Sequence, residues 1–123
     1  MWRPWNPTPA MKHLDAKEVG SAVAEAIDLG EYREHFHREY RFAAYYSAGR
    51  EWPDYEPAYR YGYDSYLDCG GHRFEEVEAE LGREWHRHRA SSRLHWIEAR
   101  EAVRDGWHHI ERSLPHALDR SLR

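Results

Sequence analysis

The stretch WPDYEPAYRYGY, residues 52 to 63, decides the fold because its pattern returns later in the chain. Displaced by 44 residues, it falls on WIEAREAVRDGW, residues 96 to 107, with a tryptophan, an alanine, an arginine and a glycine at equivalent places. The apolar positions also correspond, and in both stretches they recur at the three- and four-residue spacing of one helix face. We therefore predict two equivalent helices, each burying its rings and its glycine on the same side.

The similarity extends to the segments that precede these helices. With one more residue of displacement, REY at 38–40 aligns with REW at 83–85. This internal repeat predicts two related helix–loop–helix units, residues 31–67 and 73–114. Because no stretch shows the two-residue alternation of a strand, we expect an all-α fold in which the two units form a four-helix bundle-like domain.

An additional helix is predicted ahead of the two units, at residues 14–29. Two valines and an isoleucine recur there every four residues, and Gly30 is placed to end the helix. Residues 1–12 hold three prolines and no periodic pattern, which predicts a flexible arm. Residues 13–123 are then expected to form a single helical domain.

Other helix boundaries are predicted from residues that favour caps and breaks. Gly49 is expected to end the first helix of the first unit, and DCGGH at 68–72 to separate the units. The serines at 91–92 are placed to cap the last long helix, and Pro115 is expected to end it.

The equivalent glycines, Gly62 and Gly106, lie on the predicted buried stripes. A glycine in the middle of a helix costs about 1 kcal/mol relative to alanine. Its use at two equivalent places therefore predicts that two helices, or a helix and a ring, approach closely there. Gly82 lies off the repeated stripe, and we expect leucine there to cost less than leucine at Gly62 or Gly106.

The composition indicates one domain with an aromatic core. A chain of 123 residues can bury a single core. Its formal net charge of −4 argues against a general nucleic-acid binder, which needs a basic face. Charged residues make up 33% of the chain, but 6 Trp, 9 Tyr and 3 Phe supply large rings to bury.

The single cysteine, Cys69, excludes an internal disulfide and fits a reducing compartment. No apolar run approaches the roughly 18 residues of a membrane span, and residues 1–18 lack the apolar stretch of a secretory signal. We therefore expect a cytoplasmic location without a membrane span.

Two Glu/His pairs offer a candidate metal site. His35 and Glu39 are four residues apart, as are Glu84 and His88, so each pair shares a helix face. The two glutamates are equivalent in the repeat. Two helices that each offer Glu and His supply part of the ligand set of a carboxylate-bridged iron, manganese or zinc site in a helix bundle.

A structural role for the same glutamates is the competing hypothesis. Where a metal bundle would need further acids, the repeat offers Arg60 and Arg104. Glu39 and Glu84 would then form partly buried ion pairs with these arginines.

Three segments resemble a family of small uncharacterised bacterial proteins. They are DYEPAYRYGY at 54–63, FEEVEAELGREW at 74–85 and SSRLHWIEAREAVRDGW at 91–107, and the resemblance covers roughly residues 31–112. Such segments often accompany stress-response proteins, so the resemblance implies a protective or scaffolding role. It implies no catalytic residues.

We therefore expect a non-enzymatic, stress-associated interaction module, with the metal-binding bundle as the alternative. Self-association as a dimer is expected because Trp2, Trp5, Tyr45, Tyr46 and Tyr61 lie off the repeated stripes or in the arm. Tyrosine and tryptophan are enriched at protein interfaces. The N-terminal helix, outside the repeat, is expected to offer an apolar stripe to a protein partner or to a second copy.

Overall fold

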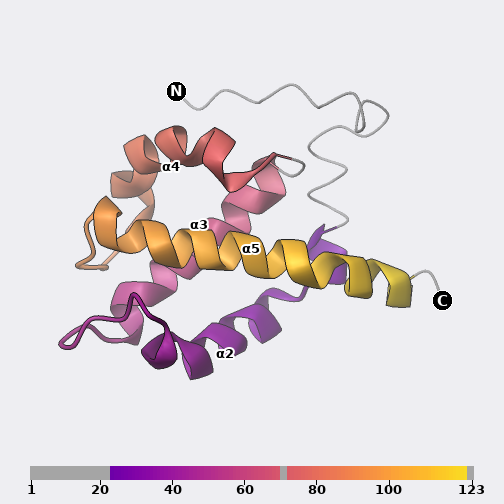
Figure 1. The fold of residues 1–123 in the computed structure, drawn as a ribbon, viewed down its shortest axis with the longest axis horizontal. Helices are drawn as coiled ribbons and strands as arrows, with labels where there is room; N and C mark the ends of the chain where they lie inside the picture. The colour runs from indigo at the N-terminus through magenta and orange to yellow at the C-terminus, as the bar shows by residue number, and fades with distance from the viewer. Residues whose placement is uncertain (1–22, 70–71, 122–123) are drawn as a thin grey trace.

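The computed structural model describes residues 23–69 and 72–121, with side chains up to residue 114. These residues are all-helical, as predicted, and contain no strand (Figure 1). The elements are α2 (Leu29–Glu39), the short 3-10 helix η2 (Tyr40–Phe42), α3 (Trp52–Cys69), α4 (Phe74–His88) and α5 (Trp96–Ser121). Among the described residues, no helix is long and apolar enough to cross a membrane.

The two predicted units pack as a bundle-like domain. α3 and α5 cross at the centre of the molecule, while α2 and α4 lie on opposite sides of this pair (Figure 1). α2 packs against α3, and α4 packs against both α3 and α5. The core between them is built mainly from rings, as the composition predicted.

The α3–α5 crossing confirms the predicted role of the two glycines. A methyl group on Gly62 would lie 2.7 Å from the Val103 carbonyl oxygen, and one on Gly106 would lie 3.4 Å from the Tyr59 carbonyl oxygen. Gly106 also leaves room for the Tyr32 hydroxyl, which donates a hydrogen bond to that same Tyr59 oxygen. Tyr59 and Val103 are themselves 44 residues apart, so each glycine meets the partner helix at the equivalent place. The crossing therefore has approximate two-fold symmetry.

The same symmetry holds where α3 and α5 begin. The Glu51 N–H donates to the Asp54 carboxylate at 3.0 Å, and the His95 N–H donates to the Glu98 carboxylate at 3.5 Å. These two pairs are equivalent in the repeat, and each satisfies a backbone N–H that a helix start leaves without a partner.

Ion pairs join each of these helix starts to the loop before the other helix. Arg93, ahead of α5, pairs with Asp54 at 2.6 Å, and Arg50, ahead of α3, pairs with Glu98 at 3.2 Å. Asp54 is only 3% exposed, and its hydrogen bonds with Arg93 hold its carboxyl pKa well below the usual value. Neither ion pair is predictable from the sequence, because each joins loop and helix residues that no short motif connects.

Ser92 does not cap the last helix, contrary to the sequence-based prediction. Its hydroxyl donates to the Asp54 carbonyl oxygen at 2.6 Å and accepts from the Leu94 N–H at 3.1 Å. The helix begins only at Trp96, because residues 93 and 94 are used to contact α3 and the core. At the other end, α5 continues through Pro115 to Ser121. Proline lacks an N–H, but its fixed φ is compatible with a helix.

The boundary at Gly30 also differs from the prediction. Residues 23–26 are helical, but the chain leaves the helix before Asp28, whose side chain accepts the Glu31 N–H at 2.9 Å. Asp28 thus caps α2, and Gly30 lies in the first turn of that helix. An aspartate cap is favourable enough to restart the helix before the glycine. The rest of the predicted helix at 14–29, and the predicted arm at 1–12, lie outside the described residues.

The first unit has a shorter helix than predicted. α2 ends at Glu39 and is followed by η2 and a loop, where Gly49 was expected to be the stop. In this loop the Ser47 N–H donates to the Tyr55 hydroxyl at 2.9 Å, and the Tyr46 hydroxyl donates to the Arg50 carbonyl at 3.3 Å. Tyrosine side chains therefore satisfy loop backbone groups that a longer helix would have satisfied internally.

Candidate functional site

The four predicted metal ligands lie in two separate places. His35 is on α2, where its ring stacks on His109 of α5 at a centroid distance of 4.3 Å, and Glu39 is exposed at the end of α2. Glu84 and His88 are on α4, at the opposite side of the molecule (Figure 1). Within residues 23–69 and 72–121, no group of three or more His, Cys, Asp or Glu side chains is arranged to hold a metal ion.

The structure gives the two arginines partners other than the predicted ones. The ion pairs are Arg60–Asp64 at 3.1 Å, Arg104–Glu75 at 3.9 Å and Arg87–Glu84 at 3.3 Å. In each pair at least one side chain is largely exposed, so these contacts contribute little to stability. The predicted buried pairing of Glu39 and Glu84 with these arginines is therefore corrected. Nearer carboxylates on the same or the adjacent helix outcompete them.

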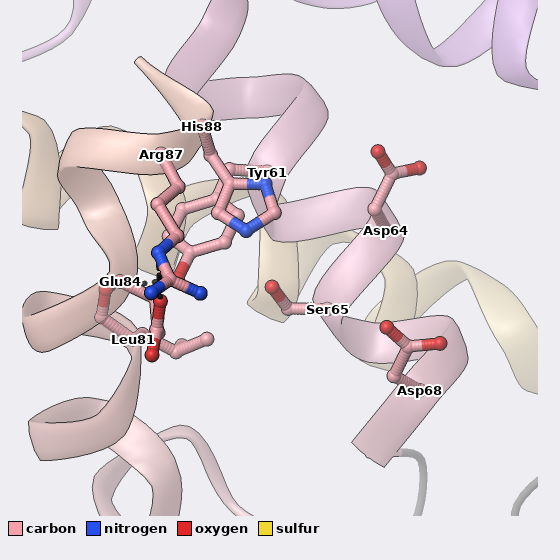
Figure 2. A pocket seen from close by; sticks show the side chains of 8 residues that line it. All are labelled: Tyr61, Asp64, Ser65, Asp68, Leu81, Glu84, Arg87 and His88. Carbon is pink, nitrogen blue, oxygen red and sulfur yellow. Dashed lines mark hydrogen bonds and ion pairs between the residues drawn. The ribbon is translucent and has the colours of Figure 1, made fainter. Parts of the chain in front are cut away.

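A hollow of about 580 Å³ lies between α3 and α4 (Figure 2). Its size falls within the range of small-molecule sites. Polar side chains of α3 line one wall, and α4 supplies a carboxylate, an arginine and an imidazole on the other. The lining residues are Tyr61, Asp64, Ser65, Asp68, Leu81, Glu84, Arg87 and His88.

Ser65 is the buried polar group of this pocket. It is only 6% exposed, and its side chain makes no hydrogen bond with any described residue. Figure 2 shows its hydroxyl directed into the space between α3 and α4. Although the residue is buried, the hydroxyl oxygen itself remains accessible from the pocket, where a ligand or a water molecule can bond to it.

The carboxylates around the pocket differ in whether an arginine pairs with them. Asp64 pairs with Arg60, and Glu84 pairs with Arg87. Asp68 forms no ion pair with the described residues. Burial and the neighbouring Asp64 raise the pKa of the Asp68 carboxyl, against an opposing effect of His88. The pocket therefore carries excess negative charge near Asp68 once that carboxyl is ionised.

Aromatic rings form part of the pocket wall. The Tyr61 ring stacks on His88 with centroids 4.4 Å apart and planes 18° apart. The Tyr61 hydroxyl donates to the Leu81 carbonyl oxygen at 2.9 Å, and burial raises its pKa. The hydroxyl is thus used to hold α4 against α3, while the ring provides a flat surface.

The rings expected to remain for a dimer interface belong instead to the internal structure. Tyr61 is buried in the pocket wall, and Tyr46 packs on Tyr55 with centroids 5.9 Å apart. The Tyr45 hydroxyl lies 2.6 Å from both the Tyr59 hydroxyl and the Asp105 carboxylate. The loop that ends the short α2 folds these side chains back onto the core. Trp2 and Trp5 lie outside the described residues.

The equivalent place in the other half of the repeat is occupied by a ring. His109 of α5 corresponds to Ser65 of α3, and Phe36 of α2 corresponds to Leu81 of α4. His109 packs against Phe36, with centroids 5.2 Å apart, and against His35. Beside it remains a hollow of only about 160 Å³. The large pocket therefore exists where the repeat places serine instead of histidine.

Sequence reasoning named Glu84 and His88 but missed the α3 wall of the site. The missed residues, Asp64, Ser65 and Asp68, share one face of α3 because they are spaced by one, three and four residues. The sequence pattern that indicated them was three small polar side chains within an otherwise aromatic helix. At the equivalent positions the second unit carries two histidines and an arginine.

No family model, no curated protein and no solved structure matches the sequence or the fold. The architecture defines an all-helical, bundle-like domain with an internal repeat and an aromatic core.

Proposed function

We propose that the chain is a non-enzymatic interaction module that binds a ligand in the pocket between α3 and α4. The observation that carries the proposal is Ser65, a buried residue whose hydroxyl is directed into a pocket of about 580 Å³ without a hydrogen-bond partner among the described residues. A ligand in the pocket would find in this hydroxyl both a donor and an acceptor that the protein itself does not use.

The comparison with the other half of the repeat supports a binding role. There the equivalent position is filled by His109, which packs on two rings. A histidine or leucine at Ser65 would have buried more apolar surface and narrowed the hollow. The serine gives up this packing and leaves polar groups facing an open space, as ligand sites do.

The state of Cys69 favours binding over covalent catalysis. Cys69 is fully buried, and burial raises the pKa of its thiol to about 12. The thiolate is the reactive form of cysteine, so this side chain remains protonated at neutral pH. A protonated, buried thiol also fits the cytoplasmic location that we propose. A stress-associated role rests on the sequence resemblance.

We further propose that the module self-associates. Phe42 and Ile97 are each 82% exposed, so they carry apolar surface that the described core does not cover. Burying such side chains against a second copy would contribute on the order of 1.5–3 kcal/mol for each fully buried residue. The predicted N-terminal helix was also expected to take part in such contacts, but most of its residues lie outside the described range.

Ligand binding can be tested by NMR with a panel of cationic, neutral and anionic small molecules. We expect at least one class to shift the backbone amide signals of Tyr61, Ser65 and Leu81. The variant Ser65→Leu replaces the hydroxyl with an apolar side chain that projects into the pocket, and it should abolish these shifts. Ala79→Leu adds a similar side chain on the exposed face of α4 and should preserve them. Shifts at these amides that persist in Ser65→Leu, or a panel without any effect on them, would contradict the proposal.

A further inference from the structure

We infer that the α3–α4 pocket binds an organic cation that carries a guanidinium or substituted ammonium group. This inference rests on the proposed function. The charge would lie beside Asp68 and Asp64, with N–H donors directed to Ser65. The flat or apolar part of the group would lie against the Tyr61–His88 stack.

The charge balance of the pocket favours a cation over an anion. Its lining holds the carboxylates of Asp64, Asp68 and Glu84 against one arginine, Arg87. Arg60 compensates Asp64 from the rim, and Asp68 has no ion-pair partner among the described residues. A bound cation would supply the missing counter-charge, whereas an anion would be repelled by Asp68.

Ser65 can accept a hydrogen bond from a donor group of the ligand. Its hydroxyl points into the pocket, and Asp64 and Asp68 lie beside it on α3 (Figure 2). A serine hydroxyl has two acceptor lone pairs besides its own donor, and guanidinium and ammonium groups carry only donors. Such a group offers separate N–H donors to Asp68 and to Ser65, and hydrogen bonds that involve a charged group are the stronger kind.

The other wall distinguishes an organic cation from a metal ion. Tyr61 and His88 present stacked rings, and Leu81 adds apolar surface. A ring face attracts an organic cation electrostatically, and an aliphatic part can contact the leucine. A metal ion needs several donor atoms at bonding distance. No such group of three His, Cys, Asp or Glu side chains occurs in the described part of the chain.

The sharpest test uses two probes of nearly identical shape. N-acetyl-arginine amide carries a guanidinium, and N-acetyl-citrulline amide carries a neutral urea in its place. Both would be titrated into the full chain by NMR, following the amides of Tyr61, Ser65 and Leu81. We expect the arginine probe to bind at least about tenfold more tightly than the citrulline probe, because only the former is charged.

Matched variants assign the effect to the pocket. Asp68→Asn and Ser65→Ala should each weaken binding of the arginine probe by about three- to tenfold. Glu39→Gln removes one negative charge from an exposed site at the end of α2 and should leave the affinity unchanged. Melting temperatures of the three variants verify that each remains folded at the titration temperature.

A second arm identifies the source of the cation. The same arginine is presented within a glycine- and serine-containing peptide. Tighter binding of the peptide than of the amide would support the inference with a partner's side chain as ligand. Equal binding would support it with a free small cation as ligand.

The possible failures are distinguishable. Equal affinity for arginine and citrulline probes, or preferential binding of an anionic compound at the same amides, overturns the cation but preserves a binding pocket. Tighter binding of Zn²⁺ or Mn²⁺ than of the arginine probe at these amides overturns it in favour of a metal site. If no compound of any charge shifts these amides, the inference and the proposed function both fail.

Discussion

The two halves of the repeat build the same interface and use it differently. Between α2 and α5, the His109 ring packs on His35 and Phe36, so that only a small hollow remains. Between α3 and α4, the equivalent residue is Ser65, and a pocket of about 580 Å³ is open. The two places are equivalent in the repeat, so the difference teaches that a pocket can open where serine stands in place of histidine, without a new loop or domain.

The largest expected loss of stability comes from substitutions that disrupt the α3–α5 crossing, on which both halves of the repeat depend. Gly62→Leu should lower the free energy of unfolding by about 3 kcal/mol, because the added side chain meets the Val103 carbonyl oxygen, and Gly106→Leu by a similar amount, because it displaces the buried Tyr32 hydroxyl. Urea denaturation measures the change. Unaltered midpoints for both variants would show that the crossing adapts without cost.

Leucine at Gly82 should cost less than leucine at the two crossing glycines, although the site is not empty. A methyl group there would lie 2.6 Å from Trp96 Nε1. We expect Gly82→Leu to cost about 1 kcal/mol, because the half-buried Trp96 ring can shift. Ala79→Leu, on the exposed face of α4, is the neutral control.

The two ion pairs at the helix starts should be unequal despite their symmetry. Asp54 is buried, so Asp54→Asn should cost about 2 kcal/mol. Glu98→Gln removes a partly exposed partner and should cost only about 0.5 kcal/mol. Urea denaturation at pH 7 compares them, and equal losses would contradict the distinction.

Asp54 also predicts a pH dependence. Its carboxyl pKa is lowered in the folded state, chiefly by the hydrogen bonds from Arg93. The stabilisation is therefore present above the unfolded-state pKa of about 3.9 and is lost as the pH falls below it. Asp54→Asn should flatten this part of the pH profile.

The α2–α5 interface, which the His109 ring fills, should weaken in mild acid. Ser65, the equivalent residue in the pocket, has no group that titrates. Burial, His35 and Arg112 lower the pKa of His109 to about 4, against an opposing effect of Asp105. Between pH 6.5 and about 4 the unfolded chain binds the proton more readily, so stability falls as the pH falls through this window. We expect a loss on the order of 1–2 kcal/mol, discounted for partial exposure.

The measurement for this interface is urea denaturation from pH 7 to pH 4.5. His109→Phe keeps a ring on His35 and Phe36 but removes the titrating group, so its profile should be flatter than that of the parent chain. An unchanged slope in this variant would assign the pH dependence to other groups.

The smallest effect on stability is expected at the two exposed apolar residues. Phe42→Ser and Ile97→Ser should change the free energy of unfolding by less than about 0.5 kcal/mol. If the chain self-associates through them, sedimentation equilibrium should show a dimer that becomes a 14.8 kDa monomer in the double variant. A full chain that remains monomeric at high micromolar concentration would contradict self-association.

Truncation near Glu31 is a poorer test of self-association than these substitutions. It would remove Val23 and Ile27, which are buried in the core, and the Ile27 carbonyl that accepts the Tyr63 hydroxyl at 2.8 Å. Loss of a dimer after such a truncation would not be separable from loss of the fold.

Periodicity and repetition were sufficient to predict the helical class and a close approach at Gly62 and Gly106. Ring spacing and the equivalent glycines are local signals, and α3 was predicted within two residues of its observed end at Cys69. Helix ends were predicted less well where long-range contacts decide them. Asp28 restarts a helix before Gly30, and the Ser92 hydroxyl bonds to α3 instead of capping α5.

The candidate site was only half predictable. Glu84 and His88 were named from their spacing, but on the assumption that they faced an equivalent pair on α2. In the structure they face Asp64, Ser65 and Asp68 across the pocket (Figure 2). Which helix faces which is decided by packing in three dimensions, and a single sequence records it only indirectly.

The reciprocal contacts of Gly62 with Val103 and of Gly106 with Tyr59 have the geometry of a two-fold symmetric pair joined into one chain. In a true pair of identical subunits, any residue that opened one interface would open both, and the loss of packing would be doubled. Covalent linkage removes that constraint. One interface can keep its rings and maintain the fold, while the other is free to exchange them for polar groups.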